Sequence, residues 1–421
     1  MTRIGLPYGD RSLTVAVPAR NLLAVLSPRD VPACADSAAE VRRAIAAPIG
    51  AAPLHEAARA ARRVVIAADD MTRQTPVETI LPLLLDELNR GGVTDDQVTV
   101  LIALGTHRPM TPSEIQRQFG AEVTRRARVL NSPWQDPAQL VDLGATPNGT
   151  PVQMSRIALE ADFLIGVGSI VPHHIPGYSG GGKIIQPGIS GAMTTGATHY
   201  LSTRAPRSYL GQVENPVREE IEQIAGRVGL DAICNVVLDH AGRLVRAFYG
   251  HYRLAHRAGV ELSRQVYGVP LAEQADIVIA NSHPCDIEFW QAHKSLYPAE
   301  MAVKQGGTII VTTPSPEGVT VTHRDMLAFT HLDPERIDRL IADGTIHDTV
   351  SGALALAWSK VRRHANVSLV SDGIPPEDAR ALGFTPHSSL DEALGAAFHR
   401  HGSDASVVVL THAPETLPVL S

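Results

Sequence analysis

Residues 171–199 bring together imidazole, glycine and amine groups in an order that could support chemistry on a phosphate-containing ligand. His173 and His174 come first, a loop with consecutive glycines at 180–182 follows, and Lys183 comes directly after it. Successive glycines let backbone N–H groups converge on a phosphate. Imidazole moves protons near neutral pH and binds transition metals, while lysine supplies a cation or a nucleophilic amine. This segment is therefore the first candidate for a functional site.

The spacing Gly177-x4-Gly182-Lys183 is similar to that of a P-loop, but two features argue against a nucleotide triphosphatase. The lysine is followed by Ile184, where Mg²⁺ would need a serine or threonine hydroxyl, and residues 169–176 separate the loop from the preceding strand. Phosphate binding remains the favoured interpretation. The alternative is a turn that needs glycine for its backbone angles, which explains one or two glycines but not the adjoining lysine.

Polar residues with chemical potential also follow apolar segments earlier in the chain. Asp70, Thr72 and Arg73 could bind a ligand, with the arginine as a fork for a carboxylate, or could only cap the next helix. His107 follows a glycine and a threonine, where a histidine could be catalytic, capping or solvated. Considered alone, each of these residues could be either functional or purely structural.

Three further positions complete the set of candidates. His199 alone is more typical of a structural residue than of a metal ligand. Gln291 and Lys294 lie one helical turn apart, on a helix face that contacts either substrate or solvent. His173 and His174 cannot both point the same way in an extended segment, so we expect one to face the cleft and the other to pack.

Buried-type strands alternate with helices along most of the chain, which predicts parallel sheets covered on both faces. The expected fold class is α/β, with two Rossmann-like lobes and the site in the cleft between them. Ligands of such sheets bind at the carboxyl ends of the strands. The polar segments all follow expected strands: 69–76 after 63–68, 105–111 after 98–104, 172–183 after 163–167, and 281–286 after 277–280.

A lobe boundary is expected near residue 268. Residues 1–268 should form an N-terminal α/β domain that carries most of the motifs and is completed by 403–421, and residues 269–402 should form a C-terminal α/β domain. Further expected elements are an opening hairpin of 13–17 with 22–26, a helix over 292–304 and a final strand over 405–410.

Composition excludes several classes of protein. The net charge of −7 and the lack of a dense Lys/Arg cluster argue against nucleic acid as a partner. No apolar run could span a membrane and the N-terminus lacks a secretory pattern, so we expect a cytoplasmic protein. The three cysteines form no disulfide framework and no CxxC site. Neither His-Glu-x-x-His nor a serine nucleophile elbow is present, which disfavours zinc peptidases and serine hydrolases.

Three ordered motifs together resemble the lactate racemase family. They are Asp-Asp-Met-Thr-Arg-Gln-Thr-Pro at 69–76, Gly-Thr-His-Arg-Pro-Met-Thr at 105–111, and His-His-x-x-Gly-Tyr-Ser-Gly-Gly-Gly-Lys at 173–183. The likeness extends to Gln-Ala-His-Lys at 291–294 and Lys-Gln-Gly-Gly-Thr-Ile-Ile at 304–310. The resemblance implies the family's cofactor, a nickel-pincer nucleotide (nickel pyridinium-3,5-bisthiocarboxylic acid mononucleotide) derived from nicotinic acid mononucleotide.

The resemblance also implies roles for individual residues. Lys183 would be linked to the thioacyl arm of the cofactor, and His199 would be the protein ligand to nickel. His107 and His173 would be the two acid/base groups, and His173 is preferred to His174 because it stands ten residues before the lysine, as in the family pattern. Arg73 would orient the substrate carboxylate, and Gln291 and Lys294 would also contact the substrate. The residues implied to bind the cofactor or organise its site are Asp70, Thr72, Ser179, Gly180, Gly181 and Gly182.

The implied activity is a racemase or epimerase that inverts C2 of a 2-hydroxycarboxylate by reversible hydride transfer to the nucleotide. The C2 hydrogen is a poor acid, and no side chain can hold a hydride, so a cofactor is required. Inversion in both directions calls for a base on each side. Expected partners are a small 2-hydroxyacid and, transiently, cofactor-making proteins. The alternatives are a nucleotide-binding regulatory protein without turnover and another metal-dependent lyase or hydrolase; substrate identity and oligomeric state stay open.

Overall fold

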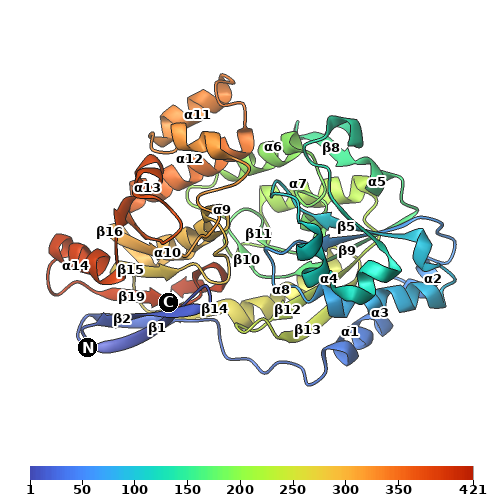
Figure 1. The fold of residues 1–421 in the computed structure, drawn as a ribbon, viewed down its shortest axis with the longest axis horizontal. Helices are drawn as coiled ribbons and strands as arrows, with labels where there is room; N and C mark the ends of the chain where they lie inside the picture. Colours follow the sequence, from blue (N-terminus) through green and yellow to red (C-terminus); the bar gives the residue numbers. More distant parts are fainter. Residues whose placement is uncertain (421) are drawn as a thin grey trace.

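The computed structural model describes residues 1–420, and its first lobe is built on a six-stranded sheet (Figure 1). The strand order is β13-β12-β9-β4-β5-β6, and every neighbouring pair is parallel except β12 with β13. The expected α/β class with mostly parallel sheets is therefore confirmed. The strands are β4 (Val64–Asp69), β5 (Val98–Ala103), β6 (Arg128–Asn131), β9 (Phe163–Ser169), β12 (Ala232–Leu238) and β13 (Leu244–Gly250).

Strand β4 illustrates why this sheet is covered on both faces. Val64 and Ile66 pack in one apolar cluster with helices α1, α3 and α4, whereas Val65 and Ala67 pack in another with α5, α7 and α8. Near-continuous apolar strands suit this position because neither face meets water. The helices of this lobe are α1 (Ser37–Ala46), α2 (Leu54–Ala57), α3 (Val77–Arg90), α4 (Pro112–Arg126), α5 (Arg156–Leu159), α6 (Ala192–Ser202), α7 (Pro216–Val228) and α8 (Leu254–Tyr267).

The second lobe contains another six-stranded sheet, in the order β18-β17-β16-β15-β19-β3, with all neighbours parallel. Its strands are β3 (Leu22–Leu26), β15 (Ala275–Asn281), β16 (Val303–Thr312), β17 (Asn366–Val370), β18 (Thr385–His387) and β19 (Val407–Leu410). Its helices are α9 (Phe289–Ala292), α10 (Leu296–Ala302), α11 (Pro334–Ala342), α12 (Thr349–His364), α13 (Pro376–Ala381) and α14 (Leu390–His401).

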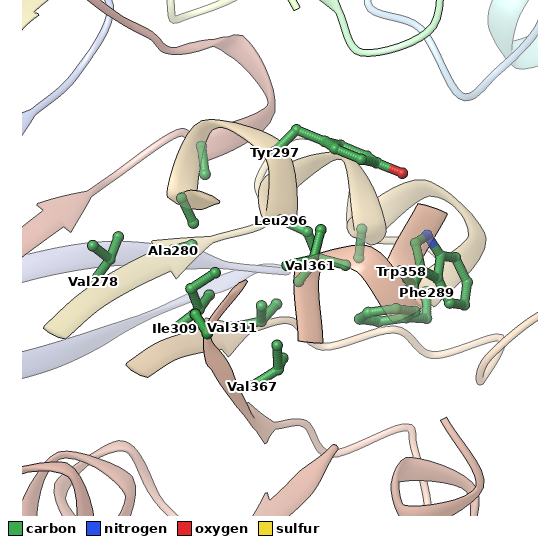
Figure 2. Close-up of a cluster of buried hydrophobic side chains, with 14 of the residues drawn as sticks. Val278, Ala280, Phe289, Leu296, Tyr297, Ile309, Val311, Trp358, Val361 and Val367 are labelled. Carbon is green, nitrogen blue, oxygen red and sulfur yellow. The ribbon is translucent and has the colours of Figure 1, made fainter. Parts of the chain in front are cut away.

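One face of the second sheet packs against helices α10 and α12. Figure 2 shows this core, in which Val278 and Ile309 of the sheet pack in one cluster with Leu296 of α10 and Trp358 of α12. The opposite face is covered by α14 and by an N-terminal hairpin of β1 (Thr2–Tyr8) and β2 (Arg11–Val17). Both faces are thus closed to solvent.

The expected opening hairpin is wrong in its pairing. Strand β2 pairs with β1, and β3 instead lies parallel to β19 at the edge of the second sheet. Apolar alternation correctly predicted two strands at these positions, but it does not specify their partners. The segment Met1–Tyr8 was not expected to be a strand.

The C-terminal segment also differs from expectation. Residues 403–421 were expected to complete the first lobe, but β19 lies between β15 and β3 in the second sheet. A further strand, β20 (Leu417–Leu420), follows it and pairs with β14 (Gly268–Leu271), so 405–410 is not the last strand. The lobe boundary near residue 268 remains a proposal.

Several short elements escaped the sequence analysis. The expected helix over 292–304 ends at Ala302, because the backbone of Val303 already pairs with Ala275 as β16 begins. Two small antiparallel strand pairs lie outside the main sheets. Their polar residues and glycines give no apolar pattern from which a strand could be predicted. The pairs are β7 (Leu140–Ala145) with β8 (Pro151–Ser155), and β10 (Pro172–His173) with β11 (Gly177–Tyr178). None of the helices in residues 1–420 has the length and apolar character that crossing a membrane requires.

Candidate active site

The carboxyl ends of β4, β5 and β9 and the segment that includes α9 line one cavity between the lobes. Parallel strands bring their following loops to the same edge of a sheet, which is why residues far apart in sequence meet here. Most residues predicted from the sequence line this cavity: Asp70, Arg73, His107, His173, Ser179, Gly180, Lys183, His199, Gln291 and Lys294. Thr72, Gly181 and Gly182 do not.

His107 is held in a defined orientation between Asp70 and Gln291. Its Nδ1 lies 2.6 Å from Asp70 Oδ2, and its Nε2 lies 2.9 Å from the amide nitrogen of Gln291. Because a carboxylate only accepts, the proton of the neutral ring sits on Nδ1, and Nε2 accepts from the amide. Burial lowers the pKa of His107, although the Asp70 charge opposes this. The ring is therefore a neutral base with its lone pair on Nε2.

Asp70 in turn is kept ionised by its neighbours. Burial opposes ionisation, but His107 and Arg73 hold the pKa of this carboxyl well below its usual range. The hydroxyl and the backbone N–H of Thr72 also donate to Asp70 Oδ1, at 2.5 and 3.1 Å. Thr72 thus acts on the site through Asp70 and Arg73 rather than from the cavity wall.

His173 carries its proton on the other ring nitrogen. The backbone N–H of Ile175 donates to His173 Nδ1 at 3.2 Å, so the neutral ring has its proton on Nε2. Burial lowers the pKa of His173 well below its usual range, and the Lys183 cation acts in the same direction. The two candidate acid/base residues are thus neutral rings of opposite tautomer.

His174 lines the same cavity as His173, so the expectation that only one of them faces the cleft is wrong. Their rings stack at 4.6 Å between centroids, and the ring of Tyr297 stacks on His174 at 4.0 Å. Strand β10 ends at His173 and the chain turns from His174 onward, so the alternation of an extended strand does not apply.

Lys183 follows the glycine loop and faces the cavity beside Arg73 and Lys294. Burial lowers its pKa well below the usual range, and the neighbouring cations of Arg73 and Lys294 act in the same direction while Asp69 opposes them. Within residues 1–420 its amine takes part in no hydrogen bond or ion pair. A lowered pKa makes the unprotonated amine easier to reach, and in that form lysine is a competent nucleophile.

His199 lies on α6 with one ring nitrogen fixed by the helix backbone. Its Nδ1 donates to the carbonyl of Thr195 at 2.8 Å, which leaves the Nε2 lone pair available. Burial lowers the pKa of His199 to about 3, with Lys183 acting in the same direction. Histidine ligands of metals commonly donate their second N–H to a carbonyl in this way. His199 can therefore serve as a nitrogen ligand.

Arg73 and Lys294 converge on a single amide. Arg73 Nη1 donates to Gln291 Oε1 at 3.4 Å, and Lys294 Nζ donates to the same oxygen at 2.5 Å. Burial lowers the pKa of Lys294 to about 8, and the Arg73 cation contributes. Two cations around one neutral acceptor can bind a carboxylate.

The glycine loop differs from the expected phosphate cradle. The N–H of Gly181 donates to Asn235 Oδ1 at 2.8 Å, and a Cβ at Gly182 would lie 3.0 Å from Ala225. Gly181, with φ of 62°, also packs against His256. These two glycines therefore serve close packing and turn geometry, while Ser179 and Gly180 reach the cavity wall.

The cavity is also lined by Asp69, Trp290 and His293, which were not predicted to be site residues. Asp69 accepts from the hydroxyl of Thr75 at 2.7 Å, and burial raises its pKa. His293 Nδ1 donates to the carbonyl of Trp290 at 2.8 Å. All three lie within or next to the family motifs at 69–76 and 291–294, and this position in the sequence could have identified them as site residues. Residues 1–420 contain no group of three or more His, Cys, Asp or Glu side chains that could hold a metal ion by themselves.

The Asp70 carboxylate should control the tautomer of His107. In Asp70→Asn the amide can donate to Nδ1, which would move the ring proton to Nε2 and remove the base from the cavity. We expect the catalytic rate to fall on the order of 10²-fold, which an activity assay would measure. Glu87→Gln is a matched control, because Glu87 also pairs with a histidine, with its Oε1 2.6 Å from His55 Nδ1, but lies outside the cavity. Equal losses in both variants would contradict this role.

Family models cover most of the chain. The model described as lactate racemase N-terminal domain matches residues 8–211, and the one described as lactate racemase C-terminal domain matches residues 271–417. The lactate racemase of Lactiplantibacillus plantarum is 30% identical over 431 residues, with 100% of both chains covered. That of Thermoanaerobacterium thermosaccharolyticum is 29% identical over 417 residues, with 97% of each covered.

Solved structures agree with these sequence matches. The lactate racemase apoprotein from T. thermosaccharolyticum superposes with a TM-score of 0.89 at 28% identity, covering 99% of this chain and 100% of that one. A Thermotoga maritima protein shares the fold, with a TM-score of 0.71 at 19% identity over 87% of this chain and 96% of that one. The chain therefore belongs to the lactate racemase family, and it is an isomerase.

Proposed function

We propose that this protein inverts the configuration at C2 of a 2-hydroxycarboxylate with a bound nickel-pincer nucleotide. The observation that carries the proposal is one cavity that holds two neutral imidazoles, His107 and His173, together with Lys183 and His199. The relatives named lactate racemase support the activity and a 2-hydroxyacid substrate. Cofactor-making proteins would be transient partners.

The cavity residues fit this cofactor. Lys183 offers an amine with a lowered pKa for the thioacyl arm, and His199 offers the Nε2 lone pair that a nickel centre needs from a nitrogen ligand. Ser179 and Gly180 form part of the cavity wall beside these two residues. When bound, the group supplies reversible hydride acceptance, which no side chain can provide.

The remaining residues would bind the substrate and move its protons. Arg73 and Lys294 would hold the carboxylate, in place of the shared Gln291 oxygen that they contact here. From one enantiomer His107 would take the hydroxyl proton at Nε2. From the other, on the opposite side, His173 would take it at Nδ1, in place of the hydrogen bond that this atom accepts from the Ile175 N–H. Net inversion needs one of the two rings to bind a proton before turnover. The ring that takes the hydroxyl proton then stays protonated, and the opposite ring gives its proton to the carbonyl oxygen, so each ring serves as base in one direction and as acid in the other.

The proposal predicts racemisation by protein that was produced together with cofactor-making enzymes. Single enantiomers of lactate, 2-hydroxybutyrate, glycerate, gluconate, malate and mandelate would be incubated with it, and both configurations quantified by chiral chromatography. At least one acid should approach an equilibrium mixture, while the apoprotein should leave all of them unchanged. Nucleotide binding without inversion of any acid would contradict the proposal and favour a regulatory protein.

A further inference from the structure

A second, smaller cavity opens from the substrate end of the active site. It shares Arg73, His173 and Lys294 with the main cavity. Beyond these residues its wall includes Gln74, Cys285 and Glu415. A substrate whose carboxylate binds to Arg73 and Lys294, which line both cavities, can extend the rest of its carbon chain into this second cavity.

The wall of the side cavity contains two buried polar atoms without partners. Gln74 Oε1 and Glu415 Oε2 have no hydrogen-bond partner among residues 1–420. Glu415 is only 7% exposed and stands in the turn that follows β19. Buried polar atoms are nearly always hydrogen-bonded, and leaving them unpaired is costly. Two such atoms in one cavity indicate a ligand that supplies the missing hydrogen bonds.

The charge state of Glu415 restricts which ligand groups fit. Burial raises the pKa of Glu415 to about 8, and the Asp239 carboxylate acts in the same direction while Lys294 opposes it. At neutral pH the side chain is therefore a carboxylic acid, which both donates and accepts. Tyr267 lies nearby with its hydroxyl donating to the carbonyl of Leu238 at 2.6 Å.

These properties exclude two kinds of substituent at C2. An alkyl or aryl group would bury Gln74 Oε1 and Glu415 Oε2 against carbon and leave both unpaired. A second carboxylate would lie against the Glu415 carboxyl, in a region where the charge of Asp239 already disfavours further negative charge. A hydroxyl group can donate to the Gln74 oxygen and exchange hydrogen bonds with Glu415.

We propose that the substrate is a 2-hydroxycarboxylate that carries one or more further hydroxyl groups on its chain beyond C2, of the aldonic acid or 2,3-dihydroxyacid type. Gln74 and Glu415 recognise these hydroxyl groups and determine specificity. This inference rests on the proposed racemase activity and narrows its substrate class.

The test compares matched acids with the cofactor-loaded enzyme. For glycerate, threonate and gluconate, kcat/KM should exceed that for lactate and 2-hydroxybutyrate by about tenfold for each hydrogen bond gained. In Gln74→Leu and Glu415→Leu the values for the hydroxylated acids should fall about tenfold, while that for 2-hydroxybutyrate should hold or rise. A misfolded variant cannot produce this opposite change. Glu415→Gln, which keeps a donor and an acceptor, should retain the preference.

Glu300→Leu is the matched control, because Glu300 is a buried carboxyl on α10 that lines neither cavity. It should change all substrates equally. Turnover of lactate or mandelate equal to that of the hydroxylated acids, or parallel losses in both leucine variants, would overturn the specificity inference and leave the racemase proposal standing. Inversion of no acid at all would overturn both.

Discussion

Lys183→Ala is expected to give a folded protein that retains no cofactor and catalyses no inversion. The amine of Lys183 is the one nucleophile that the glycine loop presents to the cavity, and it has no hydrogen bond or ion pair within residues 1–420 that would give it a structural task. Burial and neighbouring cations lower its pKa, so it is available to the cofactor in its reactive form.

Intact-protein mass spectrometry and nickel analysis would measure the loss. The parent should carry a cofactor-sized mass increment that Lys183→Ala lacks. Lys304→Ala is the control, because Lys304 pairs with Asp276 at 2.9 Å on the surface. An unchanged increment in Lys183→Ala would refute the linkage. Full nickel and full activity without any increment would show that the cofactor binds without a covalent bond.

The apoprotein provides a second measurement that does not depend on activity. Because the pKa of Lys183 is lowered in the folded state, folding removes a proton that the unfolded chain keeps, and this opposes folding more strongly as the pH falls below 10.5. Lys183→Met should therefore raise the melting temperature of the apoprotein, and more at pH 7 than at pH 9.

His107→Asn and His173→Asn should each reduce racemisation by about 10²- to 10⁴-fold, the range typical of a lost acid/base group. They should differ in the enantiomer they can still oxidise. If each ring takes the hydroxyl proton from one enantiomer, each variant should form 2-oxoacid, up to one equivalent per site, from one enantiomer only, and the two variants should prefer opposite enantiomers.

Rapid mixing with single enantiomers, followed by derivatisation of the 2-oxoacid, would measure this half-reaction. His55→Asn serves as a control, because His55 pairs with Glu87 away from the cavity. If both variants lost the ability to oxidise the same enantiomer, the assignment of the two histidines to opposite sides of the substrate would be contradicted. Cofactor content must be equal in all samples, since His107 and His173 share a cavity with Lys183.

The fold was largely predictable where strands are apolar throughout. The segments predicted at 63–68 and 163–167 correspond to β4 and β9 of a doubly covered sheet, since the apolar runs 64–68 and 163–167 are buried on both faces. Pairing was less predictable. Strand β3 joins β19, almost four hundred residues later, and no local pattern encodes so distant a partner.

The site was predictable from motifs but not in its geometry. That His107, His173 and Lys183 share a cavity follows from their places after parallel strands. The tautomers of the imidazoles depend on Asp70 and on the N–H of Ile175, and these contacts arise only when the loops are packed. The role of Gly181 was misjudged because Asn235, which takes its N–H, comes from β12.

Strand β19 has a consequence for the biogenesis of the enzyme. It fills the position between β15 and β3, so β3 cannot join its sheet before residues 407–410 have been synthesised. The turn that carries Glu415 follows directly after it. The side cavity is therefore completed only after β3, β15 and β19 have come together, although most of the sequence separates the first of these strands from the last.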